Sequence, residues 1–91
     1  MVFITAVHLA GGYRHEHITD HMWLDPADGK SGTSSTESMI KFLDEDGGVV
    51  KVAGPDGPVT VGTVHPKVGK PHLRSYADGE WSDNLLSLPR Y

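Results

Sequence analysis

Three histidines lie close together in the stretch YRHEHITDHMW at residues 13–23. His15 and His17 are two residues apart, and in an extended strand such residues point the same way, about 6–7 Å apart. Two imidazoles at that separation can share one metal ion. His21 lies four residues further, roughly 13 Å along the strand, and joins them only if a bulge near Asp20 folds the strand.

Three interpretations of this stretch stay open. The histidines and Trp23 can form an ordinary, half-exposed face of a sheet. They can instead form an aromatic, protonatable surface, extended by Tyr13, that stacks on a ring or holds an anion. A metal site is the third interpretation. We expect His15 and His17 to share one sheet face and to bind no metal tightly, because a stable zinc site usually needs three or four ligands.

A second group of polar residues lies near the end of the chain and consists of Arg74, Asp78, Asp83 and Asn84. In a structural interpretation, Asp78 forms a turn with Gly79. Asp83 or Asn84 then caps a short helical turn, and Arg74 pairs with a nearby carboxylate. In a functional interpretation, Arg74 clamps an anion and Asn84 adds amide hydrogen bonds. The two are compatible if Arg74 lines a groove between the sheet and the tail.

The composition narrows the classes of function. The net charge of −4 does not attract phosphate backbones, so we expect no nucleic-acid partner. The absence of cysteine excludes disulfides and cysteine-ligated zinc. Because nucleophile elbows and nucleotide-binding glycine motifs are missing, we expect no enzyme and no cofactor. No apolar run approaches the roughly 20 residues of a membrane helix and no signal peptide is evident, so we expect a cytoplasmic protein without a membrane partner.

Short strands and one helix must position these residues. Strands are predicted over residues 2–9, 15–24, 48–54, 58–64 and 72–76, from their β-branched and apolar content and the turn residues between them. Within 15–24, alternation places one apolar set on one face, namely Ile18, Met22 and Leu24. It places His15, His17, Thr19, His21 and Trp23 on the other face.

One amphipathic helix is predicted over residues 35–45. Ser34 fits the N-cap of a capping box, with Glu37 reaching back to its amide. The apolar side, which we expect to pack against the sheet, consists of Met39, Ile40 and Leu43.

The tail, residues 80–91, carries Trp81, Leu85, Leu86 and Leu88, and we expect it to dock on the sheet. The element order β-β-α-β-β-β predicts an α+β fold in a single small domain of residues 1–91. Its parts are a small, curled, mostly antiparallel sheet of about five strands, one amphipathic helix and a docked C-terminal tail.

With this pattern in place, the chain resembles a known family. ITAVHL, HIT and GTV, and above all HLRSYADGEWSDNLLSLP at the end, are similar to the small bacterial and phage domain family DUF 3892, whose tail pattern is YLRT-ADG-x-x-x-DNL-x-x-LP. The matching tail residues are His72, Leu73, Arg74, Ser75, Ala77, Asp78, Gly79, Asp83, Asn84, Leu85, Leu88 and Pro89. His72 replaces the usual tyrosine and Ser75 the usual threonine. The resemblance covers essentially the whole chain and implies no catalytic residues, because the family's function is unassigned.

The occurrence of the family in phages implies a small binding protein that acts on a host factor or metabolite. Our first hypothesis is a non-enzymatic binding or adaptor module with a host protein as partner, assembled as a homo-oligomer. The alternative is binding or sequestration of a small anionic metabolite such as a nucleotide, and a metal-dependent enzyme is favoured less. The candidate ligand-binding residues are His15, His17, His21, Trp23, Arg74, Asp83 and Asn84. A protein interface should present an apolar patch or a free strand edge, and a metabolite site a pocket containing Arg74 or the histidines.

Overall fold

The structure, a computed structural model, describes residues 1–77 and 79–91 of the chain. In that part of the chain, seven strands form one sheet and one α-helix packs against it, which is an α+β fold. The strands are β1 (Val2–Leu9), β2 (Ile18–Leu24), β3 (Ser31–Ser35), β4 (Val50–Gly54), β5 (Gly57–Val64), β6 (His72–Ala77) and β7 (Glu80–Ser82). The helices are α1 (Thr36–Asp44) and two short 3₁₀ helices, η1 (His15–His17) and η2 (Asn84–Ser87).

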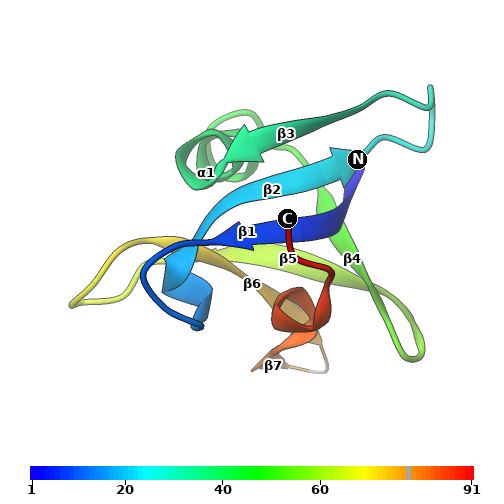
Figure 1. Ribbon diagram of the computed structural model, residues 1–91. Coiled ribbons are helices and arrows are strands. Elements are labelled where there is room, and N and C mark those ends of the chain that lie inside the picture. The colour runs from blue at the N-terminus through cyan, green and yellow to red at the C-terminus, as the bar shows by residue number, and fades with distance from the viewer. Residues whose placement is uncertain (78) are drawn as a thin grey trace.

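The strands follow the order β3-β2-β1-β4-β5-β6-β7 across the sheet (Figure 1). Neighbouring strands are antiparallel except β1 and β4, which run parallel. The α+β class is therefore confirmed, but the predicted number of five strands is wrong for the described residues, because β3 and β7 add one strand at each edge. Neither edge strand has an apolar pattern: β3 reads SGTSS and β7 has three residues.

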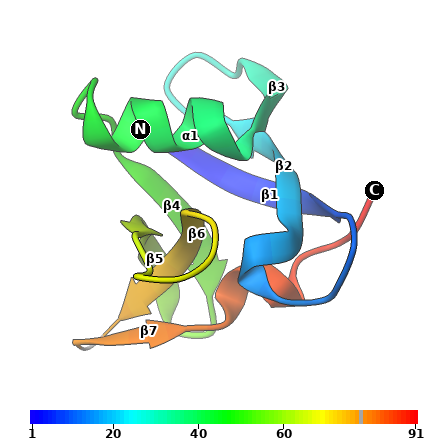
Figure 2. The same ribbon diagram turned by 90° about the vertical axis from the view of Figure 1, so that its left-hand side faces the viewer.

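The sheet is curled, and its interior holds the core. Helix α1 contacts β2 and β3 on one side and β5 and β6 on the other, while η2 contacts β1, β4 and β6. Figure 2 shows α1 and η2 at opposite sides of the curled sheet. The two helices therefore cover a common apolar cluster, whose buried members are Ile4, Val7, Ile18, Met39, Val50, Val52, Val61, Leu73 and Leu85.

Strand β2 differs from its prediction in its start and in its faces. It begins at Ile18, and Thr19 is an extra residue, since His8 pairs with Asp20 while the next residue of β1 pairs with Ile18. Such a bulge shifts the alternation of side chains by one residue. Ile18 and His21 are consequently both buried, and the predicted apolar face of Ile18, Met22 and Leu24 is wrong, because the last two are exposed.

Helix α1 forms close to where it was predicted, with its start moved by one residue. Ser35, not Ser34, is the N-cap, and its hydroxyl accepts a hydrogen bond from the Ser38 amide at 3.2 Å. Ser34 belongs to β3, where its hydroxyl accepts a hydrogen bond from Trp23 Nε1 at 3.0 Å. The prediction that the apolar side of the helix faces the sheet is confirmed. Met39 is buried, and Ile40 and Leu43 are half-buried against the core.

The predicted docking of the tail is confirmed. Leu85 is completely buried, and Leu88 is half-buried against the same core. The backbone then runs along β1, where the Val7 amide donates to the Pro89 carbonyl at 3.0 Å and the Tyr91 amide donates to the Val7 carbonyl at 3.2 Å. Trp81 is the exception, because 42% of its surface stays exposed.

Candidate functional site

His15 and His17 lie in the 3₁₀ turn η1, so the prediction that they share one sheet face is wrong. The chain coils between Arg14 and Ile18, and this points the two imidazoles in different directions. His17 closes the turn: its Nδ1 accepts a hydrogen bond from the Arg14 amide at 3.2 Å. Its ring also lies against Gly12, where a Cβ would come within 2.5 Å of the imidazole. The contacts of His17 therefore stabilise the turn that leads into β2.

The side chain of His15 points from η1 toward β6, and only 7% of the residue's surface is exposed. Its ring stacks on that of His72, with the centroids 6.4 Å apart and the planes at 24°. Its Nε2 lies 3.7 Å from Asp83 Oδ1, which is too far for a hydrogen bond. Within the described part of the chain, this buried Nε2 has no hydrogen-bond partner.

Arg74 is held beside His15 by two hydrogen bonds from its guanidinium group. Its Nε donates to the Ser82 carbonyl at 3.1 Å, and its Nη2 donates to Asp83 Oδ1 at 2.9 Å. The expected pairing of Arg74 with a nearby carboxylate is thus confirmed. Both bonds approach the guanidinium from the β7 and η2 side, so they fix its plane and leave the Nη1 donors uninvolved among the described residues.

Asn84 takes part in a hydrogen-bond network that fastens the tail to β6. Its Oδ1 accepts from Ser75 Oγ at 3.0 Å and from Ser82 Oγ at 2.7 Å, and its backbone N–H donates to Ser75 Oγ at 3.2 Å. Ser75 is completely buried. Asp83 occupies the N-cap of η2 without a side-chain cap bond. Asp78, which was grouped with these residues, lies outside the described residues.

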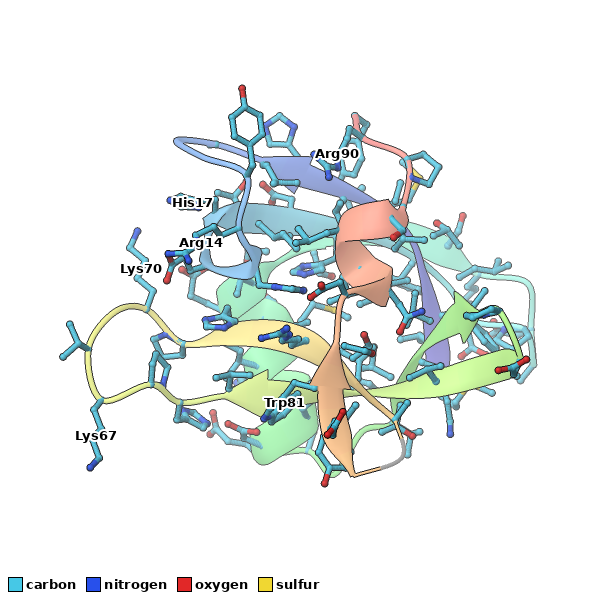
Figure 3. The ribbon with its side chains drawn as sticks, turned by 90° about the horizontal axis from the view of Figure 1, so that it is seen from below. Arg14, His17, Lys67, Lys70, Trp81 and Arg90 are labelled. Carbon is cyan, nitrogen blue, oxygen red and sulfur yellow. The ribbon has the colours of Figure 1, made fainter. Side chains whose placement is uncertain are left out.

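His15 and Arg74 meet at a pocket of about 190 Å³. The pocket is lined by Arg14, His15, Glu16, His72 and Arg74. It brings His15, from the histidine stretch near the N-terminus, together with Arg74, from the polar group near the C-terminus. These two groups are far apart in the sequence. Figure 3 views the molecule from below and labels Arg14, one of the residues that line the pocket.

Sequence reasoning did not single out Arg14 and His72 as members of a site. The available signal for His72 is its place two residues before Arg74, because alternate residues of a strand share a face. His72 Nδ1 lies 2.9 Å from the Lys70 carbonyl and donates to it, so any ligand contact of this imidazole uses Nε2. For Arg14 there was no signal, since its place depends on the packing of η1 against β6.

The electrostatics of the pocket favour a neutral His15 beside the Arg74 guanidinium. Burial is the main cause that lowers the pKa of His15, and the nearby Arg74 guanidinium is the second. The Asp83 carboxylate acts in the opposite direction, and His72 adds a further lowering. A neutral imidazole has one donor nitrogen and one acceptor nitrogen, so Nε2 can meet either kind of ligand atom.

His21 and Trp23 lie away from this pocket, on the inner side of β2. His21 is completely buried, and burial lowers its pKa to about 4, against the smaller raising effects of Asp20 and the Ser34 backbone. Trp23 is half-buried against the core and uses its Nε1 to bind Ser34. The structure therefore places both residues in the packing of β2 and β3.

In residues 1–77 and 79–91, no group of three or more histidine, aspartate or glutamate side chains is arranged to hold a metal ion. None of the helices in these ranges combines the length and the apolar character needed to cross a membrane.

A curled mixed sheet, one α-helix and a docked tail define a small α+β protein among the described residues. The chain belongs to the family described as protein of unknown function (DUF3892), whose family model matches residues 3–89 of the 91 residues. The resemblance drawn from the tail motif is thus confirmed. Comparison with curated proteins and with solved structures found no match. Any functional conclusion must therefore come from the geometry of the site.

Proposed function

We propose that this protein is a non-enzymatic binding module that holds the anionic group of a small ligand in the pocket between η1 and β6. The observation that carries the proposal is the buried Nε2 of His15, which has no partner among the described residues and lies beside the Arg74 guanidinium. A buried polar atom without a hydrogen bond costs about 1–3 kcal/mol. A phosphate or carboxylate oxygen in the pocket supplies the missing bond once the His15 ring turns its buried Nε2 toward the pocket.

The size of the pocket fits one charged group. Sites for whole drug-sized ligands measure roughly 300–1,000 Å³, and this pocket measures about 190 Å³. A phosphate or carboxylate fills such a space, and the remainder of the ligand then extends over the neighbouring surface.

The roles of the cationic residues follow from their contacts. Arg74 is preorganised by Ser82 and Asp83, so little entropy is lost when its remaining donors bind an anion. Arg14 is 82% exposed in its side chain, and it adds charge with less positional order. His15 donates from Nε2 when that nitrogen carries the proton. Asp83 opposes an incoming anion, which keeps the affinity moderate.

A binding role without chemistry is supported by the environment of the serines closest to the site. Ser75 and Ser82 bind each other and Asn84, and among the described residues they are not paired with a histidine base. A hydroxyl nucleophile needs such a base within hydrogen-bonding distance. The pocket residues orient and neutralise charge, which is sufficient for ligand binding.

Calorimetry with inorganic phosphate and ribose 5-phosphate tests the proposal. Both are expected to bind, and Arg74→Gln is expected to weaken both by tenfold or more, because a charge-assisted hydrogen bond is worth about 1.5–3 kcal/mol. Lys41→Gln, which removes an exposed cation from α1, is the matched control and should leave the affinity unchanged. No binding, or equal binding by the Arg74 variant in its folded state, would contradict the proposal.

A protein partner is the second candidate function, and the edge strand β3 favours it. Ser31–Ser35 carries neither a charged residue nor a proline, which are the features that protect an edge from pairing with another chain. A partner chain, or a second copy in a homo-oligomer, would add a strand at this edge. Native mass spectrometry of the assembly purified from cells separates the candidates: a retained small molecule supports the pocket, and a stable protein complex supports the edge.

A further inference from the structure

Two aromatic side chains, Tyr76 and Trp81, form an exposed pair next to the pocket. They lie directly opposite each other on β6 and β7, with ring centroids 5.1 Å apart and planes at 73°. Tyr76 is 44% exposed and Trp81 is 42% exposed. Trp81 is one of the large apolar side chains expected to dock with the tail, and it stays accessible instead. Exposed aromatic rings supply stacking surface for planar ligands.

This aromatic pair shares a face of the sheet with the pocket residues. Along β6, His72, Arg74 and Tyr76 alternate with Leu73 and Ser75, which are buried on the inner side. Alternate residues of a strand are about 6–7 Å apart. Arg74 and Tyr76 are therefore neighbours on one face, separated by a distance that a sugar ring can span.

The position of Trp81 is coupled to that of Arg74. Arg74 Nε donates to the carbonyl of Ser82, the residue that follows Trp81, so the guanidinium and the indole are attached to the same short strand. Gly62 on β5 pairs with Arg74, and a Cβ at Gly62 would lie 3.4 Å from the Trp81 ring. Because Gly62 has no side chain, the indole can extend over β6 as far as β5. In Figure 3, β6 runs between the labelled Arg14 and Trp81.

From this arrangement we propose that the pocket and the Tyr76–Trp81 pair together bind a free mononucleotide. The proposal rests on the anion-binding function above: the phosphate occupies the pocket at Arg74 and His15, the sugar lies along β6, and the base stacks against Trp81. Base stacking on an aromatic side chain is worth roughly tenfold in affinity or more.

A free nucleotide fits the surface better than a nucleic-acid strand does. The pocket accommodates one anionic group, and the net charge of the chain is −4. The exposed acidic residue Glu80 lies directly beside Trp81 and repels further phosphates. Binding of a strand needs a continuous positive groove along its backbone.

Calorimetry on the full chain with inorganic phosphate, ribose 5-phosphate, adenosine 5′-monophosphate and a short single-stranded oligoadenylate tests the inference. The monophosphate is expected to bind about tenfold more tightly than ribose 5-phosphate. Trp81→Ala should abolish that difference and leave the affinity for ribose 5-phosphate unchanged. Trp81→Phe, which keeps a ring, should retain part of the difference and serves if the alanine variant does not fold.

Trp23→Phe is the matched control, because it leaves Trp81 as the only tryptophan in the chain. This variant should keep the nucleotide affinity, and its fluorescence should change on addition of the monophosphate. Equal affinity for the monophosphate and ribose 5-phosphate, unaffected by Trp81→Ala, would overturn the nucleotide inference and leave the anion-binding proposal intact. Failure of every probe to bind would overturn both. Tighter binding of the oligoadenylate than of the monophosphate would overturn the assignment to a free nucleotide.

Discussion

At the scale of single residues, the surroundings of a histidine side chain decide whether it belongs to the candidate site or to the core. His15 and His21 are both buried histidines with lowered pKa values. His15 lines a pocket beside Arg74, whereas His21 lies inside the sheet. The same residue type therefore serves a candidate ligand site in one place and core packing in the other.

Asp83 tunes the proposed anion affinity. Its carboxylate accepts from Arg74 Nη2 at 2.9 Å and repels an anion that approaches the same guanidinium. Asp83→Asn keeps an oxygen acceptor and removes the negative charge. We expect the affinity for phosphate to rise several-fold, measured by calorimetry, with the melting temperature nearly unchanged. An unchanged or weaker affinity would show that Asp83 does not face the bound anion.

The protonation of His15 predicts a pH dependence for anion binding. Burial and Arg74 lower its pKa in the free protein. A bound anion favours the imidazolium form and raises that pKa, so binding takes up a proton and becomes tighter as the pH falls below neutral. Sulfate is a suitable probe because its charge is constant in this range.

His15→Gln should flatten this pH profile. The other charged or titratable groups around the pocket are Arg14, Glu16, His72, Arg74 and Asp83. Of these, His72 is the other imidazole, so His72→Gln is the necessary comparison. If His72→Gln flattens the profile and His15→Gln does not, His72 takes up the proton on anion binding, and the assignment to His15 is wrong.

At the scale of elements, η2 joins stability to the site. It inserts Leu85 into the core while its N-cap Asp83 holds Arg74. Leu85→Ala leaves a cavity where a completely buried side chain was, and we expect a loss of about 2–5 kcal/mol in the free energy of unfolding, measured by urea denaturation. Leu86→Ala, at a half-buried neighbour, should cost clearly less. Equal costs would mean that η2 does not seal the core as the structure shows it.

The regular elements could be predicted from the sequence because each has a local pattern. Strands β1, β4, β5 and β6 have β-branched or apolar runs between turns, and α1 has an apolar stripe and a serine cap. Strand β3 has no apolar residue, and its pairing depends on β2 beside it. The bulge at Thr19 likewise follows from pairing with β1. These features arise from tertiary contacts and leave no local pattern.

In the candidate site, too, the contacts between residues near in sequence could be predicted, and those that depend on tertiary packing could not. The pairing of Arg74 with a nearby carboxylate could be predicted, because Arg74 and its partner Asp83 are only 9 residues apart in the sequence. The meeting of His15 with Arg74 could not, because it requires η1 to coil and pack on β6. The strand-like spacing of His15 and His17 favoured an extended chain, and that prediction failed at the turn.

At the scale of the whole molecule, stability should fall in acid. His21 has a pKa of about 4 in the folded protein against 6.5 for an ordinary histidine. Between these values the unfolded chain binds more protons than the folded one, so the free energy of unfolding decreases as the pH falls through this window. The loss from this group reaches up to about 3 kcal/mol. Burial also lowers the pKa of His15, so this histidine adds to the loss of stability in the same direction.

Urea denaturation at neutral pH and near pH 4 measures this effect. His21→Leu removes the buried imidazole, and the variant should lose most of the difference between the two conditions. His65→Gln, at an exposed histidine, is the control and should retain it. If His21→Leu keeps the full acid sensitivity, the acid-labile group lies elsewhere.

Anion binding in the pocket between η1 and β6 can be followed at the pocket residues themselves by nitrogen-15 nuclear magnetic resonance during a phosphate titration. We expect saturable shifts of the Arg74 Nε–H signal and of the His15 and His72 ring nitrogens. The ring nitrogens of His21, buried in the core, should stay unchanged and serve as the internal control. Unchanged signals for Arg74 and His15, or weak shifts spread evenly over the surface without saturation, would contradict the claim.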